Sequence, residues 1–596
     1  MSTHVVATAG HVDHGKSTLI RALTGMEPDR WEEEKRRGLT IDLGFAWTTL
    51  PSRRQVAFVD VPGHQRFLAN TLAGLGAAPV VCFVVAADEG WRAQSSDHRD
   101  AIAALNIRHG LIVVTRADRA PERADDVLAQ TRAELAETGL RDVPGVVVSA
   151  VQGTGLPELR ATLDTVLAEV PQPDAAARVR LWVDRSFTIT GAGTVVTGTL
   201  SAGSLAVGES LELLGAQRKR DVAIRGLQSR GEPYPALAPV VRAALNLRGV
   251  AREKVRRGDA LVTPNAWPAT RVLDVRRTTG GSWTETTSHL VVHVGTAAVP
   301  ARLRPFGDDH GRLTLDRRLP LVLGDRLVLR DPGTHRVLGG AQVLDADPPS
   351  LRRRGDSARR AAALVTMTPE GEPALEVARR GAVRARHLSG LGLPTDAVPD
   401  GVRVFDEWWV HAATYDAWQS RLKAAVDELH TRDPLADGLS RGAARDLLGL
   451  PDEVLLDAVV GDAGLEQRGG HIRAPGTGRD LGSAEAAVCQ VEAQLRAAPF
   501  RAPEAYELQA LRLGARELAA AERAGRVLRL RDGVVLLPTA PALAMRQLAR
   551  LDQPFTTSEA RQALDTTRRV AIPLLEHLDA RGWTRRLDAG HREIVR

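Results

Sequence analysis

The feature that most constrains this chain of 596 residues is a glycine-rich loop near its N-terminus. Residues 10–17 are GHVDHGKS, which fits the pattern G-x-x-x-x-G-K-[ST]. They follow the apolar run VVATA and precede the helical segment STLIRAL. In this strand–loop–helix context, the backbone amides of the loop surround the phosphates of a nucleotide. The sequence therefore predicts an α/β domain that binds a nucleoside triphosphate.

The side chains of this loop have distinct expected roles. Lys16 reaches the β- and γ-phosphate oxygens, and the Ser17 hydroxyl binds Mg²⁺. The other expected nucleotide contacts in the loop are Gly10, Asp13, His14, Gly15 and Thr18.

Two later segments complete the predicted phosphate site. The apolar run QVAFVD ends in Asp60, where a carboxylate usually anchors Mg²⁺, and the amide of Gly63 can meet the γ-phosphate. His64 is expected to position the attacking water, with an ordinary surface histidine as the alternative. Thr40, within RRGLTID, is expected to close over Mg²⁺ while the γ-phosphate is present. The predicted metal ligands are therefore Ser17, Thr40 and Asp60.

Two short segments indicate which base is bound. Thr115-Arg116-Ala117-Asp118 follows GLIVV, and Ser149-Ala150 follows GVVV. A carboxylate that accepts hydrogen bonds from N1–H and the exocyclic amine selects guanine. The usual tetrapeptide is N-K-x-D, so Thr115 lacks an amide contact, whereas Arg116 can stack on the base. The expected nucleotide contacts here are Thr115, Arg116, Asp118, Ser149 and Ala150.

The pattern of the sequence changes along the chain and predicts several domains. Up to about residue 170, apolar runs alternate with helical segments, as in a parallel sheet covered on both faces. From 178 to about 345, short strands separated by Gly and Pro predict two antiparallel barrels or sandwiches. A helix-turn-helix followed by an apolar hairpin, the winged-helix plan, then recurs about every 60 residues. The predicted boundaries are 1–172 for the nucleotide-binding domain, 173–262 and 263–347 for the β domains, and 348–415, 416–476, 477–540 and 541–596 for the winged helices.

The composition limits the partners and the compartment. A net charge of +6 favours a polyanionic partner, unless it reflects a GC-rich genome that encodes arginine. The apolar runs fall short of the ~20 residues that span a bilayer, and the N-terminus lacks the basic and apolar segments of a secretory signal. Cys82 and Cys489 are too few for a disulfide framework or a four-cysteine zinc site. We expect a cytoplasmic monomer without a membrane partner.

The motifs GHVDHGKS, RGLTID, DVPGH, TRAD and SA, in this order and spacing, resemble those of translational GTPases of the elongation factor Tu class. The TIDLG continuation, the segment VDRSFTITGAGTVVTGTLSAG and the winged-helix extension narrow the resemblance to the selenocysteine-specific elongation factor (SelB) family. The resemblance covers essentially the whole chain and is weaker in the first winged repeats. It implies ribosome-stimulated GTP hydrolysis and delivery of selenocysteinyl-tRNA to recoded UGA codons. It also implies that the winged helices bind an mRNA hairpin.

The same resemblance assigns further sites. It implies GTP and GDP as ligands, Mg²⁺, and a monovalent cation beside Asp13. It places Asp184, Arg185 and Arg242 in a selenocysteine pocket, with Asp184 orienting the arginines. A selenol is more acidic than a thiol, whose pKa is ~8.5, so it is an anion at neutral pH and calls for fixed cations. Without the resemblance, a surface ion pair on a β-barrel would be the favoured interpretation.

The last winged repeat carries the predicted RNA contacts. FTTSEARQAL predicts a first helix, Asp565-Thr566-Thr567 a turn, and RRVAIPLLEHLDA a second helix that Pro573 can kink. Residues 541–596 hold ten arginines and seven acidic residues, whereas 416–476 hold seven basic and eleven acidic residues. The basic end therefore suits a tether to RNA. The predicted hairpin contacts are Arg568, Arg569, Arg585 and Arg586, with Arg592 on or beside the wing.

Three alternatives stand beside this interpretation. The first is a related GTPase that handles other aminoacyl-tRNA or RNA quality control, against which TIDLG, Arg185 and Arg242 argue. The second is a GTP-regulated DNA-binding protein, because winged helices more often bind DNA than RNA. The third is a C-terminal half that binds nothing and serves as a spacer. A selenocysteine tRNA gene and its synthase in the same organism would support the central hypothesis.

Overall fold

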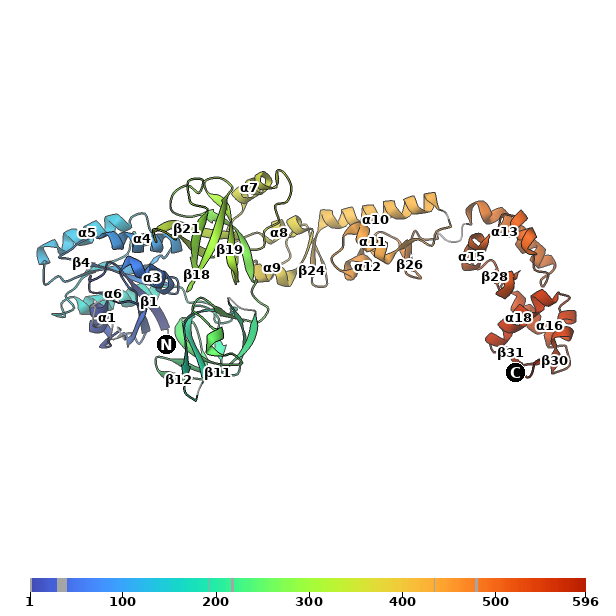
Figure 1. Ribbon diagram of the computed structural model, residues 1–596, viewed down its shortest axis with the longest axis horizontal. Helices are drawn as coiled ribbons and strands as arrows, with labels where there is room; N and C mark the ends of the chain where they lie inside the picture. The colour runs from blue at the N-terminus through green and yellow to red at the C-terminus, as the bar shows by residue number, and fades with distance from the viewer. Residues whose placement is uncertain are drawn as a thin grey trace. The chain divides into compact units, whose positions relative to one another are not determined.

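The computed structural model describes residues 3–28, 40–191, 193–215, 219–433, 435–476 and 481–595. Residues 36–39 of the predicted RRGLTID segment lie outside these described residues. The chain forms two compact units. The first consists of Met1–Glu376 and Arg384–Val398, and the second of Val377–Val383 and Pro399–Arg596. Figure 1 shows a sheet and two barrels in the first unit and mainly helical modules in the second.

The first unit begins with the predicted α/β domain. Its six-stranded sheet has the order β2-β3-β1-β4-β5-β6, and only β2 and β3 pair antiparallel. The strands are Thr3–Ala9 (β1), Gly44–Thr49 (β2), Gln55–Asp60 (β3), Val80–Ala86 (β4), His109–Thr115 (β5) and Gly145–Val147 (β6). The helices are Lys16–Thr24 (α1), Leu68–Leu75 (α3), Ala93–Leu105 (α4), Ala124–Leu135 (α5) and Leu156–Glu169 (α6).

Helices cover both faces of this sheet, which explains its nearly continuous apolar strands. Val5 of β1 belongs to the hydrophobic cluster that includes residues of α3, α4 and α5. Its neighbour Val6 belongs to the cluster on the opposite face, with residues of α1 and α6. Adjacent strand residues therefore stabilise two cores, and the carboxyl ends of β1, β3 and β5 are held at one edge.

The second domain is a closed antiparallel barrel. Its strands follow the order β10-β15-β7-β8-β14-β11, and β10 also pairs with β11, which closes the barrel. The strands are Arg180–Ile189 (β7), Gly193–Leu200 (β8), Ser210–Leu214 (β10), Arg220–Ser229 (β11), Val241–Arg248 (β14) and Ala260–Val262 (β15). The short strands Leu205–Ala206 (β9), Glu232–Tyr234 (β12) and Ala236–Leu237 (β13) lie beside it.

The third domain is a second closed barrel, of order β16-β19-β18-β17-β20-β21. Its strands are Thr270–Arg277 (β16), His289–Val294 (β17), Ala297–Pro305 (β18), His310–Leu319 (β19), Arg326–Arg330 (β20) and Val337–Asp345 (β21). Buried and exposed residues alternate strictly along the first eight residues of β18, as expected where one face lines a core. The predicted choice between barrels and sandwiches is therefore resolved in favour of barrels.

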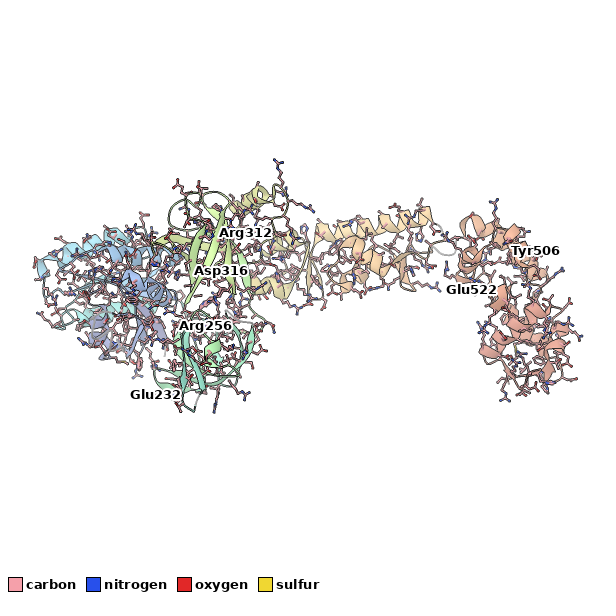
Figure 2. All side chains as sticks on the ribbon, viewed as in Figure 1. Glu232, Arg256, Arg312, Asp316, Tyr506 and Glu522 are labelled. Atoms are coloured by element: carbon pink, nitrogen blue, oxygen red, sulfur yellow. The ribbon has the colours of Figure 1, made fainter. Side chains whose placement is uncertain are left out.

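A buried ion-pair network attaches the next helix, Asp356–Thr366 (α7), to the third domain. Arg360 donates hydrogen bonds to Asp274 and Asp345, each at 2.6 Å, and Arg312 donates to Asp274 at 2.7 Å. Arg312 lies on β19, which also carries Asp316 (Figure 2). A buried charge is stable only when it is paired, and Arg360 joins the two carboxylates while Arg312 also pairs with Asp274. The start of the predicted first winged helix is thereby packed on the barrel.

The remaining elements are mainly helical and include the predicted winged modules. The first predicted module and the segment before it contain Pro373–Arg380 (α8), Ala382–Arg384 (β22), Ala385–Leu391 (α9), Val402–Phe405 (β23) and Trp408–His411 (β24). The next module contains Ala412–Arg432 (α10), Leu439–Ser440 (β25), Arg441–Leu448 (α11), Glu453–Asp462 (α12), Glu466–Arg468 (β26) and His471–Arg473 (β27). A third contains Glu485–Ala497 (α13), Ala505–Ala510 (α14), Ala515–Arg523 (α15), Leu528–Arg529 (β28) and Val535–Leu536 (β29). Figure 2 places Tyr506 on α14 and Glu522 on α15.

The last module agrees closely with its sequence pattern. It contains Ala540–Leu548 (α16), Phe555–Thr556 (β30), Thr557–Ala563 (α17), Arg568–Ala580 (α18), Thr584–Arg586 (β31) and His591–Ile594 (β32). Thr556 and Glu559 form a capping box at the start of α17. Gly582 ends α18 with φ +72°, and α18 extends through the buried Pro573 as one helix. None of the described helices is long and apolar enough to cross a membrane.

Candidate functional site

A cavity of about 580 Å³ lies at the edge of the sheet where the predicted nucleotide motifs meet. Its walls come from the glycine-rich loop, the segments after β3 and β5, and the segment after β6. The predicted residues that line it are Asp13, Gly15, Lys16, Ser17, Thr18, Thr40, Gly63, Thr115, Arg116, Asp118 and Ala150. Motifs that are up to about 140 residues apart in the sequence therefore form one site.

Three glycines shape the phosphate end of this cavity. Gly10 has φ +128°, and a Cβ there would lie 2.1 Å from the Val84 carbonyl oxygen. Gly15 has φ +82° and begins α1, whose first turn directs its amides toward the cavity. A Cβ on Gly63 would lie 2.4 Å from the Val12 amide nitrogen and 2.7 Å from Lys16 Nζ. The loop therefore depends on close backbone approach at these positions.

Lys16 is held in place by its own loop. It is only 6% exposed, and its ammonium donates hydrogen bonds to the carbonyl oxygens of Gly10 at 3.1 Å and His11 at 2.7 Å. The loop's own carbonyl oxygens thus fix this charge beside the cavity. This arrangement suits a phosphate oxygen, which would gain a charge-assisted hydrogen bond.

Oxygen atoms at the predicted metal site converge. Ser17 Oγ donates a hydrogen bond to Asp60 Oδ2 at 2.6 Å and lies 3.1 Å from Thr40 Oγ1. Thr8, which the sequence interpretation did not include, donates to Asp60 Oδ1 at 2.7 Å. Mg²⁺ prefers such hard oxygen ligands, so these residues fit it. Asp60 is fully buried and does not line the cavity, so its carboxylate acts behind Ser17.

The base end of the cavity contains the TRAD segment. Ser149 Oγ donates to Asp118 Oδ1 at 2.6 Å, and this hydrogen bond lowers the pKa of the exposed Asp118 carboxyl. Asp118 is thus kept ionised and ready to accept hydrogen bonds from a guanine. Thr115 Oγ1 donates to the His14 carbonyl oxygen at 2.6 Å, which joins this segment to the phosphate loop.

Arg116, which was predicted to stack on the base, also makes polar contacts in the structure. Its guanidinium donates to Glu89 at 2.9 Å and to Asp88 at 3.3 Å. It also donates to the carbonyl oxygen of Asp13. Arg116 therefore bridges two acidic residues and the phosphate loop while lining the cavity.

Two histidines differ sharply in their surroundings. His14 is completely buried, and burial lowers its pKa to about 3, so it is neutral at physiological pH. His64 is exposed and does not line the cavity. Its Nδ1 accepts a hydrogen bond from the Arg66 amide at 3.1 Å and thereby caps the short helix Gln65–Phe67. The predicted catalytic imidazole therefore lies outside the lining of the cavity.

Two residues of α4 hold the phosphate loop through hydrogen bonds to its backbone amides. The sequence motifs did not indicate either residue. His98 Nδ1 accepts a hydrogen bond from the Gly10 amide at 2.9 Å, and Gln94 accepts one from the Val12 amide at 3.1 Å. Burial lowers the pKa of His98 to about 3, which keeps Nδ1 unprotonated and able to accept. No local sequence signal identifies these residues, because only the tertiary fold brings α4 to the loop.

The predicted pocket residues of the second domain form a compact cluster. Arg242 donates to the Asp184 carboxylate at 2.9 Å and to Thr197 Oγ1 at 3.0 Å. Thr197 in turn donates to Asp184. Asp184 is 7% exposed, so this ion pair is largely removed from water. The predicted orienting role of Asp184 toward Arg242 is consistent with this geometry.

Arg185, by contrast, makes its contacts with the first domain. It lies 3.1 Å from the Asp42 carboxylate and donates to the Leu43 carbonyl oxygen. The Phe45 ring packs against both arginines, with its centroid 3.4 Å from Cζ of Arg242 and 5.3 Å from Cζ of Arg185. Cation–π contacts of this kind favour desolvated guanidinium groups. The sequence motifs did not indicate Phe45 or Asp42 as neighbours of these arginines.

A second cavity, of about 850 Å³, opens beside this cluster. Asp42, Asp184 and Arg185 line it, together with the segment around the short helix Arg252–Lys254 and with Arg256 and Arg257. Figure 2 shows Arg256 on this barrel. The cavity therefore has an arginine-rich wall next to the predicted selenocysteine pocket.

The predicted RNA-binding arginines of the last module fall into two groups. Arg568, Arg585 and Arg586 are exposed, although Arg585 Nε donates to Glu593 at 3.0 Å and Arg586 Nε donates to the Asp588 carbonyl oxygen at 2.9 Å. Arg569 instead binds the preceding module. It donates to the carbonyl oxygens of Ala502 and Pro503 and pairs with Glu504, each at 3.1 Å.

Arg592 lies on the wing strand β32, as expected, but its side chain is buried. It is only 5% exposed, and its Nε donates to Asp579 at 2.9 Å. Its NH1 donates to Thr557 Oγ1 at 3.1 Å. Arg592 therefore joins the wing to α17 and α18. A residue on a strand faces either the core or solvent, and a composition argument alone does not say which.

Family models match four parts of the chain. Residues 1–169 match the elongation factor Tu GTP binding domain, and residues 193–262 match elongation factor Tu domain 2. Residues 282–350 match the β-barrel domain of the selenocysteine-specific elongation factor, and residues 546–592 match the winged helix of elongation factor SelB. These matches agree with the α/β domain, the two barrels and the last winged module described above.

Whole-chain comparisons extend this result. The chain is 32% identical to the selenocysteine-specific elongation factor of Escherichia coli (strain K12), and the alignment covers 98% of each chain. It is 30% identical to that of Desulfomicrobium baculatum, again over 98% of each chain. A crystal structure of bacterial selenocysteine-specific elongation factor EF-Sec matches the fold with a TM-score of 0.77 and 25% identity over 100% of both chains. The predicted resemblance is confirmed: the chain belongs to the selenocysteine-specific elongation factors, GTPases of the elongation factor Tu class.

Proposed function

We propose that this GTPase carries selenocysteinyl-tRNA to the ribosome and recognises the amino acid through Arg185 and Arg242. The observation that carries the proposal is the paired, partly desolvated arginine cluster at the start of the second domain. Selenocysteine is an anion at neutral pH, whereas serine and cysteine are largely neutral there. Fixed guanidinium groups in a partly dry pocket would therefore favour the selenolate through charge-assisted hydrogen bonds.

The GTPase cycle would use the residues of the first cavity. GTP and GDP bind with guanine at Asp118, Ser149 and Ala150 and with phosphates at the glycine-rich loop. Ser17 and Thr40, with Asp60 behind them, would hold Mg²⁺, which neutralises phosphate charge when bound. Lys16 and the Gly63 amide stabilise the charge that develops as water attacks the γ-phosphorus and GDP leaves.

His64 would act on the water in this reaction. Its side chain is exposed and does not line the cavity, so we infer that ribosome binding turns it toward the γ-phosphate. Its role is to position the water, not to remove a proton as a strong base. A monovalent cation beside Asp13 is part of the same proposal, supported by the position of Asp13 in the cavity wall.

The C-terminal modules would bind an mRNA hairpin and thereby tether the factor to the paused ribosome. Arg568, Arg585 and Arg586 are exposed and available for phosphates and unstacked loop bases. Arg569 would support them by fixing the first turn of α18 to the preceding module. The factor would act in the cytoplasm as a monomer, with the boundaries between winged modules near residues 416, 477 and 541.

Competition between two aminoacyl-tRNAs tests the proposal. With GTP present, Arg242→Ala should lower the affinity for selenocysteinyl-tRNA far more than that for seryl-tRNA on the same tRNA body. Removing one partner of a desolvated charge pair costs ~2–5 kcal/mol. Arg225→Ala, an exposed arginine of the same barrel, is the control. Equal losses for both tRNAs would show that Arg242 contacts the tRNA body and would refute the pocket.

A further inference from the structure

One short segment of the first domain connects the nucleotide cavity with the arginines of the second domain. At its start, Thr40 Oγ1 lies 3.1 Å from Ser17 Oγ in the nucleotide cavity. At its end, the Phe45 ring packs on Arg242 and Arg185. Residues 40–45 therefore touch both sites within six residues. The segment therefore links the two sites directly.

Asp42, in the middle of this segment, contacts two arginines of the barrel. Its Oδ2 lies 3.1 Å from Arg185, and its Oδ1 lies 3.4 Å from Arg257. Asn70 of α3 reinforces the connection. It donates to the Ile41 carbonyl oxygen at 2.8 Å and accepts from Arg257 at 2.7 Å.

The two selenol-binding arginines thus have carboxylate partners of different origin. Arg242 pairs with Asp184, which belongs to the same barrel. Arg185 pairs with Asp42, which belongs to the GTPase domain and lies two residues after a predicted Mg²⁺ ligand. A carboxylate fixes the direction of a planar guanidinium, because their geometries match. The direction of Arg242 is therefore built into the barrel, whereas that of Arg185 depends on the nucleotide-sensing segment.

We propose that Asp42 is the positioning residue that aligns Arg185 for the selenol and makes this alignment depend on bound GTP. The inference rests on the proposed selenocysteine pocket. While Thr40 is held at Ser17, Asp42 is in reach of Arg185 and Arg257. When Thr40 is released after hydrolysis, Asp42 leaves with it, and Arg185 loses its fixed direction. Arg242 is then the one arginine of this pair that keeps a fixed direction in the pocket.

The charges of the cluster agree with this role. Arg185, Arg242 and Arg257 carry three positive charges, and Asp42 and Asp184 carry two negative charges. One selenolate would therefore neutralise these five groups with Asp42 still in place. Asp42 can thus remain bound to Arg185 while the amino acid occupies the pocket. By linkage, a group that favours selenocysteinyl-tRNA only in the GTP state also strengthens GTP binding in the presence of that tRNA.

The test compares isosteric variants of the two carboxylates in the full-length protein. Dissociation constants for selenocysteinyl-tRNA and seryl-tRNA are measured with a non-hydrolysable GTP analogue and with GDP. Asp42→Asn should weaken selenocysteinyl-tRNA binding about tenfold with the GTP analogue and leave it unchanged with GDP, within the ~5- to 150-fold range of coupling between sites. Asp184→Asn should weaken binding in both nucleotide states.

Controls separate positioning from general electrostatics and from folding. Glu253→Gln removes an exposed carboxylate from the wall of the same cavity and should have little effect. The affinity of Asp42→Asn for GDP without tRNA should match that of the unaltered protein, because the contacts of Asp42 with Arg185 and Arg257 belong to the GTP state. In an Arg185→Ala background, Asp42→Asn should cause no further loss, because Asp42 acts through Arg185.

Each outcome decides one point. Equal weakening in both nucleotide states, an additive loss in the Arg185→Ala background, or tighter binding after Asp42→Asn would overturn the role of Asp42. Tighter binding would mean that Asp42 competes with the selenol instead of aligning its partner. If Arg185→Ala itself fails to discriminate between the two tRNAs, the selenocysteine pocket is wrong and the proposed function fails first.

Discussion

The phosphate-binding loop and the last winged module are both proposed to bind polyanions, but they hold their cations differently. Lys16 is buried and fixed by two carbonyl oxygens of its own loop. Arg568 and Arg585 are exposed, and Arg585 is bound to a neighbouring carboxylate of the wing. A preorganised cation loses little entropy on binding, whereas an exposed one must be ordered or must exchange partners. The first arrangement suits one ligand geometry, and the second suits an adaptable RNA surface.

The largest expected effect comes from the preorganised cation. Lys16→Ala should lower GTP affinity by about 10³-fold, near 4 kcal/mol, because it removes a fixed charge from a partly dry phosphate site. Isothermal titration calorimetry measures this change. Lys423→Ala, at an exposed position of α10, serves as the control and should bind GTP normally. A loss below tenfold would show that the backbone amides, not the ammonium, dominate phosphate binding.

His64 is an exception within the GTPase domain, because it is an exposed side chain and not a buried, fixed one like Lys16. It belongs to the DVPGH motif, yet its side chain is exposed, as are Arg585 and Arg586 of the wing. His64→Ala should leave GTP affinity within about twofold and slow ribosome-stimulated hydrolysis on the order of 10²-fold, as for loss of one transition-state contact. Single-turnover phosphate release on ribosomes gives the rate, with Arg66→Ala as the neighbouring control. Normal turnover would identify His64 as a surface residue.

The difference between the two regions also explains how far the sequence could predict them. Gly10 and Gly63 are set by backbone geometry, since a Cβ at either position would clash with main-chain atoms. Such positions require glycine, so the motif can be recognised in the sequence, and its residues line one cavity in the structure. Family resemblance supplied Arg185 and Arg242, and the structure brings them together around Phe45. The partners His98 and Asp42 lie on other elements and were not predictable from local pattern.

The arginines of the last module show what the sequence could not predict. Arg568 and Arg569 are adjacent in sequence and equal in charge, and no local pattern distinguishes them. The structure leaves Arg568 exposed and uses Arg569 to bind the segment 502–504. Arg592 is likewise used in packing, because it is buried and donates a hydrogen bond to Asp579. Charge counting therefore does not tell which arginines of the module are exposed and which are used in packing.

This distinction predicts different phenotypes for neighbouring arginines. Arg569→Ala should lower the free energy of unfolding by about 1–2 kcal/mol, because it removes charged hydrogen bonds to two carbonyl oxygens. Arg568→Ala should leave stability unchanged and reduce the salt dependence of hairpin binding by about one counterion. Chemical denaturation and filter binding at several salt concentrations measure the two quantities. If both variants lose stability equally, Arg568 is also structural.

The smallest expected effect concerns the wing, where Arg585 is paired across the strands with Glu593. Phosphate must displace this carboxylate before it binds Arg585, so the ion pair reduces the contribution of the arginine to RNA binding. Glu593→Gln should release the guanidinium and raise hairpin affinity by about threefold, with a steeper salt dependence, because an exposed ion pair is worth only ~0.2–1 kcal/mol. Asp552→Asn removes the same charge at an exposed site of the module away from the wing strands. A larger gain in hairpin affinity for Glu593→Gln than for Asp552→Asn would show that Arg585 contacts RNA. Equal gains would show that the wing affects RNA binding only through its net charge.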